Sequence, residues 1–185
     1  MTHPPQFDNN SLERFREYLK LLAYSQLDSL LARQIDASDV VQQTMLDAMA
    51  KAEQFRGCGE DEFLSWLRQI LANNLIDAQR YHGRAKRDVA RNRSLDESVF
   101  ESFRRVEVLA QSCSTPSQHA IKSEQLLRLP EALGALSDTQ REAIVLHHLQ
   151  GLKLAETAKR MGKSESAVCG LLHRGLKRLH AILED

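Results

Sequence analysis

The sequence predicts an all-α protein of two small helical domains joined by a flexible linker, the C-terminal domain being a helix-turn-helix. Aromatic residues are only 5% of the 185 residues, and Leu, Ala, Gln, Arg and Glu are frequent, a composition that favours helices over sheets. Apolar residues recur at spacings of three and four over most of the chain, as on the buried side of amphipathic helices. A serine-rich stretch without this period separates two such groups, so two domains are expected.

The N-terminal domain is expected to span residues 1–93 and to contain three main helices. Asn10 and Glu13 have the spacing of a capping box, and Asp36 or Ser38 is expected to cap the second helix. The third is expected to run as one long helix over residues 63–87. The apolar positions at helical spacing form the predicted core: Leu12, Phe15, Leu19, Leu22, Leu27, Leu30, Leu31, Val41, Met45, Ala48, Ala52, Phe55, Phe63, Trp66, Leu67, Ile70, Leu71 and Leu75.

Two polar faces are expected on this domain. The second helix turns Asp39, Gln42, Gln43 and Asp47 outward, and on residue type alone such an acidic, amide-rich face is usually only solvated. On the third helix, Arg68, Gln69, Asn73, Arg80 and Arg84 could follow a phosphate backbone. Asn73 and Asp77 are one turn apart and able to pair with each other or with a neighbouring helix. Between the two helices, glycines flank Cys58 and permit unusual backbone angles.

Residues 94–125 are expected to form the linker, because they are rich in serine and lack a sustained apolar period. The alternative is a further helix packed on either domain, supported by Phe100, Phe103, Val106 and Val108. The C-terminal domain, residues 126–185, starts within a helix that begins near Gln118 and breaks at Ser137 and Asp138. A helix from Thr139 to Leu149 follows, ended by Gln150 and Gly151.

The helix-turn-helix is the most specific pattern in the chain. A short helix, Leu154 to Met161, is stopped by Gly162, and Ser164 then caps a helix from about Glu165 to Leu183. Ala158 is small enough for two crossing helices to approach, and Val168 is expected in the core between them. The residues left facing outward are those that such proteins place in the major groove: Ser164, Ser166, Ala167, Cys169, Gly170, His173, Arg174 and Lys177.

The net charge of zero and the pI of about 7.1 hide a block pattern. Residues 36–62 hold seven Asp and Glu against two Lys and Arg, whereas residues 63–93 and 151–182 each hold seven Lys and Arg against two acidic residues. Basic blocks attract phosphates. The pattern therefore suggests two contacts with DNA and one with a protein.

Several functional classes are excluded by the sequence. No apolar run approaches the length of a membrane span, and the N-terminus lacks the pattern of a secretion signal, so a cytoplasmic protein is expected. The three cysteines are far apart, which indicates neither disulfides nor a zinc site. His147 and His148 are adjacent and expected to point apart, and Ser164 has no obvious catalytic partner. We therefore expect no enzyme, no metal, no cofactor and no small-molecule substrate. The alternative from these residues is an ordinary dimeric helix-turn-helix regulator, which would read a palindromic site.

Two blocks together resemble the bacterial RNA polymerase sigma factors of the extracytoplasmic-function group. DASDVVQQTMLDAMAKAEQF followed by FLSWLRQILANNLIDAQR is similar to their second region, and ALGALSDTQREAIVLHHLQGLKLAETAKRMGKSESAVCGLLHRGLKRL to their fourth. They stand in the family's order and cover most of the chain. The resemblance implies a subunit that binds core RNA polymerase and directs it to promoters.

The resemblance also implies roles for particular residues. Asp39, Gln42 and Gln43 would grip the coiled coil of the largest polymerase subunit, which replaces the solvated interpretation of that face. The loop from Phe55 to Glu62 and the helix after it would hold an extruded base and the open strand of the minus-ten element, with Asp77 structural. The minus-ten contacts implied are Arg56, Arg68, Asn73, Arg80 and Arg84.

In the fourth region, the outward residues of the last helix would read the minus-thirty-five element, and the surface from Leu136 to Leu149 would meet the flap of the second-largest subunit. Many relatives have a lysine and an arginine where Cys169 and Leu171 stand, so upstream reading is expected to be weak or different. Losing one bidentate contact forfeits about 1–3 kcal/mol of base discrimination. Control by a separate anti-sigma protein, a kinase or expression level is expected.

Overall fold

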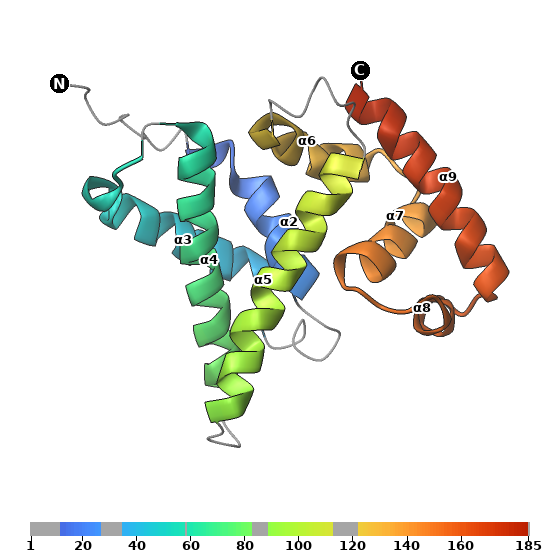
Figure 1. The fold of residues 1–185 in the computed structure, drawn as a ribbon, viewed down its shortest axis with the longest axis horizontal. Helices are drawn as coiled ribbons and strands as arrows, with labels where there is room; N and C mark the ends of the chain where they lie inside the picture. The colour runs from blue at the N-terminus through green and yellow to red at the C-terminus, as the bar shows by residue number, and fades with distance from the viewer. Residues whose placement is uncertain (1–11, 27–34, 58, 83–88, 113–121, 185) are drawn as a thin grey trace. The chain divides into compact units, whose positions relative to one another are not determined.

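The computed structural model describes residues 12–26, 35–57, 59–82, 89–112 and 122–184, and every regular element within these ranges is a helix (Figure 1). The chain divides into two compact units, Met1–Glu101 and Ser102–Asp185. None of the helices in these ranges combines the length and the apolar composition that a membrane span demands. The prediction of an all-α protein with two helical parts is confirmed.

The N-terminal unit is built around three helices that pack on one another: α2 (Arg16–Gln26), α3 (Ala37–Ala50) and α4 (Glu60–His82). A short 3-10 turn, η2 (Ala52–Gln54), follows α3. Four aromatic side chains meet between these elements, with ring centroids 5.3–5.6 Å apart: Phe15, Phe55, Phe63 and Trp66. The predicted core positions within the described ranges are buried, except that Ala52 and Trp66 remain partly exposed.

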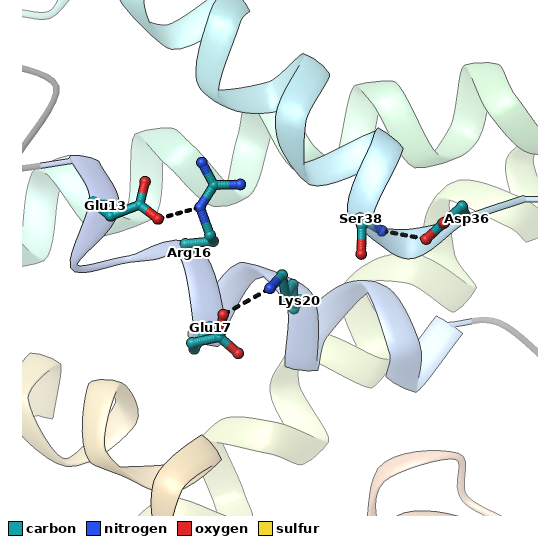
Figure 2. A network of polar contacts seen from close by, with 6 residues as sticks. All are labelled: Glu13, Arg16, Glu17, Lys20, Asp36 and Ser38. Carbon is teal, nitrogen blue, oxygen red and sulfur yellow. Dashed lines mark hydrogen bonds and ion pairs between the residues drawn. The ribbon is translucent and has the colours of Figure 1, made fainter.

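The start of α3 is fixed by Asp36. Its side chain accepts a hydrogen bond of 2.8 Å from the backbone N–H of Ser38, as Figure 2 shows. This N-cap satisfies one of the donors left open at the start of a helix, and it decides between the two caps expected from the sequence. In the preceding segment, pairs one turn apart join Glu13 to Arg16 and Glu17 to Lys20 (Figure 2). Asn10 and residues 27–34 lie outside the described residues.

The C-terminal unit contains α6 (Lys122–Gly134), α7 (Asp138–Ile144), a π-helical turn η4 (Val145–Leu149), α8 (Leu154–Met161) and α9 (Glu165–Glu184). The long helix α9 packs against α6, α7 and α8. A Cβ at Gly175 would lie 3.0 Å from Ile144 Cδ1, so glycine allows α9 and α7 to approach closely. Arg128 donates to the carbonyl of Ile182 at 3.1 Å and so satisfies an open group at the end of α9.

Part of the stretch expected to be a linker is helical instead. Residues 94–112 form most of helix α5 (Val89–Ser112). Within residues 97–112 of this helix, the buried side chains form a stripe at helical spacing: Val99, Ser102, Phe103, Val106, Leu109 and Ala110. The division between the two units falls inside this helix. In the N-terminal unit Gln26 donates to the carbonyl of Ser98 at 3.0 Å, and in the C-terminal unit Arg105 donates to that of Leu149 at 3.1 Å. Over residues 94–112 the structure thus corrects the expectation towards the helical alternative, because these contacts and the buried stripe order the chain; residues 113–121 of the predicted linker lie outside the described residues.

The arrangement of the two histidine rings in η4 also differs from the expectation. The rings of His147 and His148 form an edge contact, with centroids 4.9 Å apart, instead of pointing apart. A π-helical turn is wider than an α-turn and rotates less per residue, so neighbouring side chains diverge less. His147 Nδ1 lies 2.8 Å from the carbonyl oxygen of Leu152, which fixes its ring.

Acid is expected to destabilise the C-terminal unit through His148. Burial, with a smaller contribution from His147, lowers the pKa of His148 below its usual 6.5. The folded state therefore favours the neutral ring, so this contribution to stability is complete above pH 6.5 and is lost as pH falls through the lower folded-state pKa. Thermal melting of the wild type and of His148→Gln between pH 7.5 and 5 measures this. The variant should show the shallower pH dependence, and equal slopes would contradict the assignment.

Candidate nucleic-acid interface

The turn between α8 and α9 has the predicted geometry. Gly162 adopts φ 62° and ψ 34°, the left-handed conformation that glycine reaches without strain. The N–H of Lys163 bonds to the carbonyl of Ala158 at 3.0 Å, which closes the end of α8 as a Schellman motif. Ser164 Oγ accepts a bond of 3.2 Å from the N–H of Ala167 and caps α9. Val168, in the first turn of α9, is fully buried, so both a cap and core packing position the front of this helix.

The predicted upstream DNA-reading residues share the solvent face of α9. Seven are exposed and Gly170 is partly exposed: Ser164, Ser166, Ala167, Cys169, Gly170, His173, Arg174 and Lys177. Further exposed cations on α8, α9 and the flanking turns are Lys153, Lys159, Arg160, Lys163 and Arg178. The structure therefore brings the predicted set together on a cationic surface.

Two details of α9 bear on how this face could read DNA. A Cβ at Gly170 would lie 3.1 Å from Arg174 Nη1, so the arginine side chain lies back along its own helix over the glycine. At the positions that depart from the family pattern, Cys169 is exposed whereas Leu171 is partly buried. The Cys169 thiol therefore occupies a solvent-facing position at which a longer cationic side chain could contact DNA.

The expected minus-ten residues are not all on one face. Asn73 and Arg80 are exposed on α4; Asn73 accepts a bond of 3.3 Å from Gln69, and Arg80 pairs with Asp77 at 3.4 Å. Within α4, Asn73 is therefore paired with Gln69, and Asp77 is paired with Arg80. Arg68 is partly buried, with its guanidinium 5.4 Å from the centre of the Tyr18 ring. Five residues correspond to about 140° around a helix, so Arg68 is set apart from Asn73.

The loop before α4 depends on Gly57. A Cβ at this position would lie 2.8 Å from Phe55 Cε2 and 2.7 Å from a carboxylate oxygen of Glu62. Because the Phe55 ring is itself fixed against Phe63 and Trp66, glycine is required by close packing, whereas a Cβ at Gly59 would meet open space. Arg56 is exposed and donates to the carbonyl of Glu53 at 2.9 Å. Arg84 and Cys58 lie outside the described residues.

The exposed face of α3 is larger than the sequence indicated. Asp39, Gln42 and Gln43 are exposed as predicted. Leu46 and Met49, one and two turns further along, are also exposed, at 53% and 49%. Sequence reasoning missed them, although Leu46 follows Gln42 by four residues and Met49 follows Leu46 by three, the spacing of one helix face. Leu46 and Met49 thus add two apolar side chains to this polar face, the mixed character that a protein-binding surface has.

Asp47, in contrast, does not simply face solvent. It is partly buried and accepts bonds from Gln43 of its own helix and from Asn74 of α4. Beside this contact lies an open groove of about 340 Å³, lined by Ile35, Asp36, Asp39, Val40, Gln43, Asn74, Asp77 and Ala78. The predicted outward position of Asp47 is corrected, because its carboxylate lies at the boundary of α3 and α4 and accepts charge-assisted bonds from an amide of each helix.

Comparison with known families identifies both halves of the chain. Residues 13–85 match the model of Sigma-70 region 2, and residues 126–179 match that of Sigma-70, region 4. The fold and these regions define a transcription factor of the sigma-70 type. The chain belongs to the extracytoplasmic-function (ECF) RNA polymerase sigma factors.

Three relatives illustrate the similarity. The chain is 31% identical over 149 residues to the ECF sigma factor BldN of Streptomyces coelicolor, covering 80% of this chain and 51% of BldN. It is 31% identical to SigD of Mycobacterium tuberculosis, covering 78% and 62%, and 30% identical to SigF of Caulobacter vibrioides, covering 78% and 69%. The chain thus spans about half to two thirds of the length of these relatives. A structure of CnrH in complex with the cytosolic domain of CnrY aligns with 96% of this chain and 90% of that one, at 24% identity and a TM-score of 0.34.

Proposed function

We propose that this chain binds core RNA polymerase and directs it to particular promoters in the cytoplasm. The observation that supports this most is the presence of both sigma regions in order, each with an exposed face suited to its role. The N-terminal unit would bind polymerase and the minus-ten element, and the C-terminal unit the minus-thirty-five element. The chain would act by binding alone, as a specificity subunit.

The α9 surface supports the upstream DNA contact. Small side chains at its start, Ser164, Ser166 and Ala167, allow the helix to enter the major groove. His173, Arg174 and Lys177 follow on the same exposed face and would meet bases and phosphates. Because Cys169 offers no cation, we propose that discrimination at this element depends mainly on the residues after Gly170.

Arg174→Ala and Lys177→Ala are each expected to weaken promoter binding and to reduce its salt dependence. Removing one phosphate contact lowers the slope of log K against log salt by about 0.9. Holoenzyme binding to promoter DNA, measured at several salt concentrations, tests this. Lys20→Ala is the control, because it removes an equal charge that pairs with Glu17 in α2. Unchanged slopes in both α9 variants would remove these residues from the interface.

Transcription from purified core polymerase tests the proposed function. Adding the chain to core polymerase and a library of genomic promoters should give new, sequence-directed transcripts. A transcript pattern that does not change would contradict the proposal. A stable homodimer that binds palindromic sites without polymerase would instead support the dimeric regulator. Control by a separate anti-sigma protein stays a prediction, to be tested by co-purification.

A further inference from the structure

A polar network joins α4 to the exposed face of α3. Asn74 Nδ2 lies 3.1 Å from Asp47 Oδ2, and Asp47 Oδ1 accepts a bond of 2.8 Å from Gln43 Nε2. The two oxygens of one carboxylate therefore connect an amide of α4 to an amide on the face proposed to bind polymerase. Gln43 and Asn74 also line the same groove.

The network is anchored at the α4 end. Asn74 Nδ2 also donates to Thr44 Oγ1 at 3.1 Å, and the Thr44 hydroxyl donates to the carbonyl of Val40 at 2.8 Å. An amide nitrogen carries two hydrogens, so both acceptors can be served at once. Thr44 is fully buried and Asn74 partly buried. The Asn74 amide is thus fixed in orientation, and the bonds that it and Gln43 make to a charged carboxylate are of the stronger kind.

We propose that Asn74 is a positioning residue for polymerase binding, which acts by holding Asp47 and, through it, the side chain of Gln43. This inference rests on the proposed function. A glutamine amide fixed before binding loses less conformational freedom when the partner arrives than a mobile one does. Asn74 therefore contributes to affinity for polymerase without contacting it.

The test is a double-mutant cycle with the full chain and purified core polymerase, measuring the Kd of the complex. Asn74→Ala should raise the Kd about 3- to 10-fold, the effect of freeing one long side chain. In a Gln43→Ala background the same substitution should have no further effect, because the group that it positions is gone. Asn74→Asp keeps the shape but cannot donate and repels Asp47, so it should behave at least as severely. Ser65→Ala, at an exposed position of α4, is the control and should leave the Kd unchanged.

The outcomes separate this inference from the function beneath it. If the wild-type chain does not bind core polymerase, the proposed function itself fails. If it binds, and Asn74→Ala is neutral or its effect multiplies fully with that of Gln43→Ala, only the positioning role is overturned. A neutral Gln43→Ala overturns it too. Melting curves are recorded for each variant. If Asn74→Ala folds poorly, the cycle with Asn74→Asp is used in its place. Loss of folding in both would assign Asn74 to stability alone and overturn the inference.

Discussion

Val168→Asp is expected to unfold the C-terminal unit. Val168 lies in the first turn of α9, which packs against α8, and its side chain is fully buried. Removing an aliphatic side chain from such a site costs about 1.5–3 kcal/mol, and an unpaired buried carboxylate costs several kcal/mol more. The sum is comparable to the whole stability of a small domain, about 5–15 kcal/mol. Circular dichroism should show lost helix content and the loss of one thermal transition.

Ala167→Asp is the matched control for this experiment, because it places the same carboxylate one residue earlier at an exposed position in the first turn of α9. Acidic groups are favourable near a helix N-terminus, so this variant should melt like the wild type. Its added negative charge should still weaken promoter binding. A Val168→Asp protein that melts at the wild-type temperature would contradict the assigned core of the helix-turn-helix.

Replacing both Asp39 and Gln42 by Ala is expected to raise the Kd for core polymerase about 10- to 100-fold while helix content stays unchanged. Each residue is exposed on α3, so truncation costs the fold little, whereas central interface residues contribute about 1–2 kcal/mol or more to binding. Co-purification and direct Kd measurement with purified polymerase test this. Unchanged binding would remove α3 from the interface.

Leu46→Asp extends the same test to the apolar part of the face. Because Leu46 is 53% exposed in the free chain, the substitution should not alter melting, but a carboxylate in the contact would have to be desolvated on binding. Affinity for polymerase should fall at least as far as in the double variant. Glu97→Ala, which alters one exposed charge elsewhere in the N-terminal unit, is the control expected to bind like the wild type.

Local patterns in the sequence were sufficient for the helix-turn-helix. The positive φ of Gly162, the cap at Ser164 and the buried Val168 each follow from neighbouring residues, and such short-range signals do not depend on the rest of the fold. The cap at Asp36 is of the same kind.

Features that depend on contacts between distant residues could not be predicted in this way. Serine content and the lack of a sustained apolar period predict a linker over residues 94–125, yet residues 94–112 lie in α5 and Ser102 is fully buried within its apolar stripe. The bond from Asn74 to Asp47 joins residues on two helices, and the packing of Arg68 over Tyr18 likewise joins α4 to α2. Helical periodicity gives the face of a residue but not its partner on another helix.

Selection of bound sequences from a random DNA pool, with and without core polymerase, tests whether the two units read two promoter elements together within one holoenzyme. The chain together with core polymerase should enrich two short sequence blocks at a fixed separation, and the chain alone should enrich neither strongly. Enrichment of a palindrome by the chain alone, or no enrichment in the presence of polymerase, would contradict this joint reading of two elements.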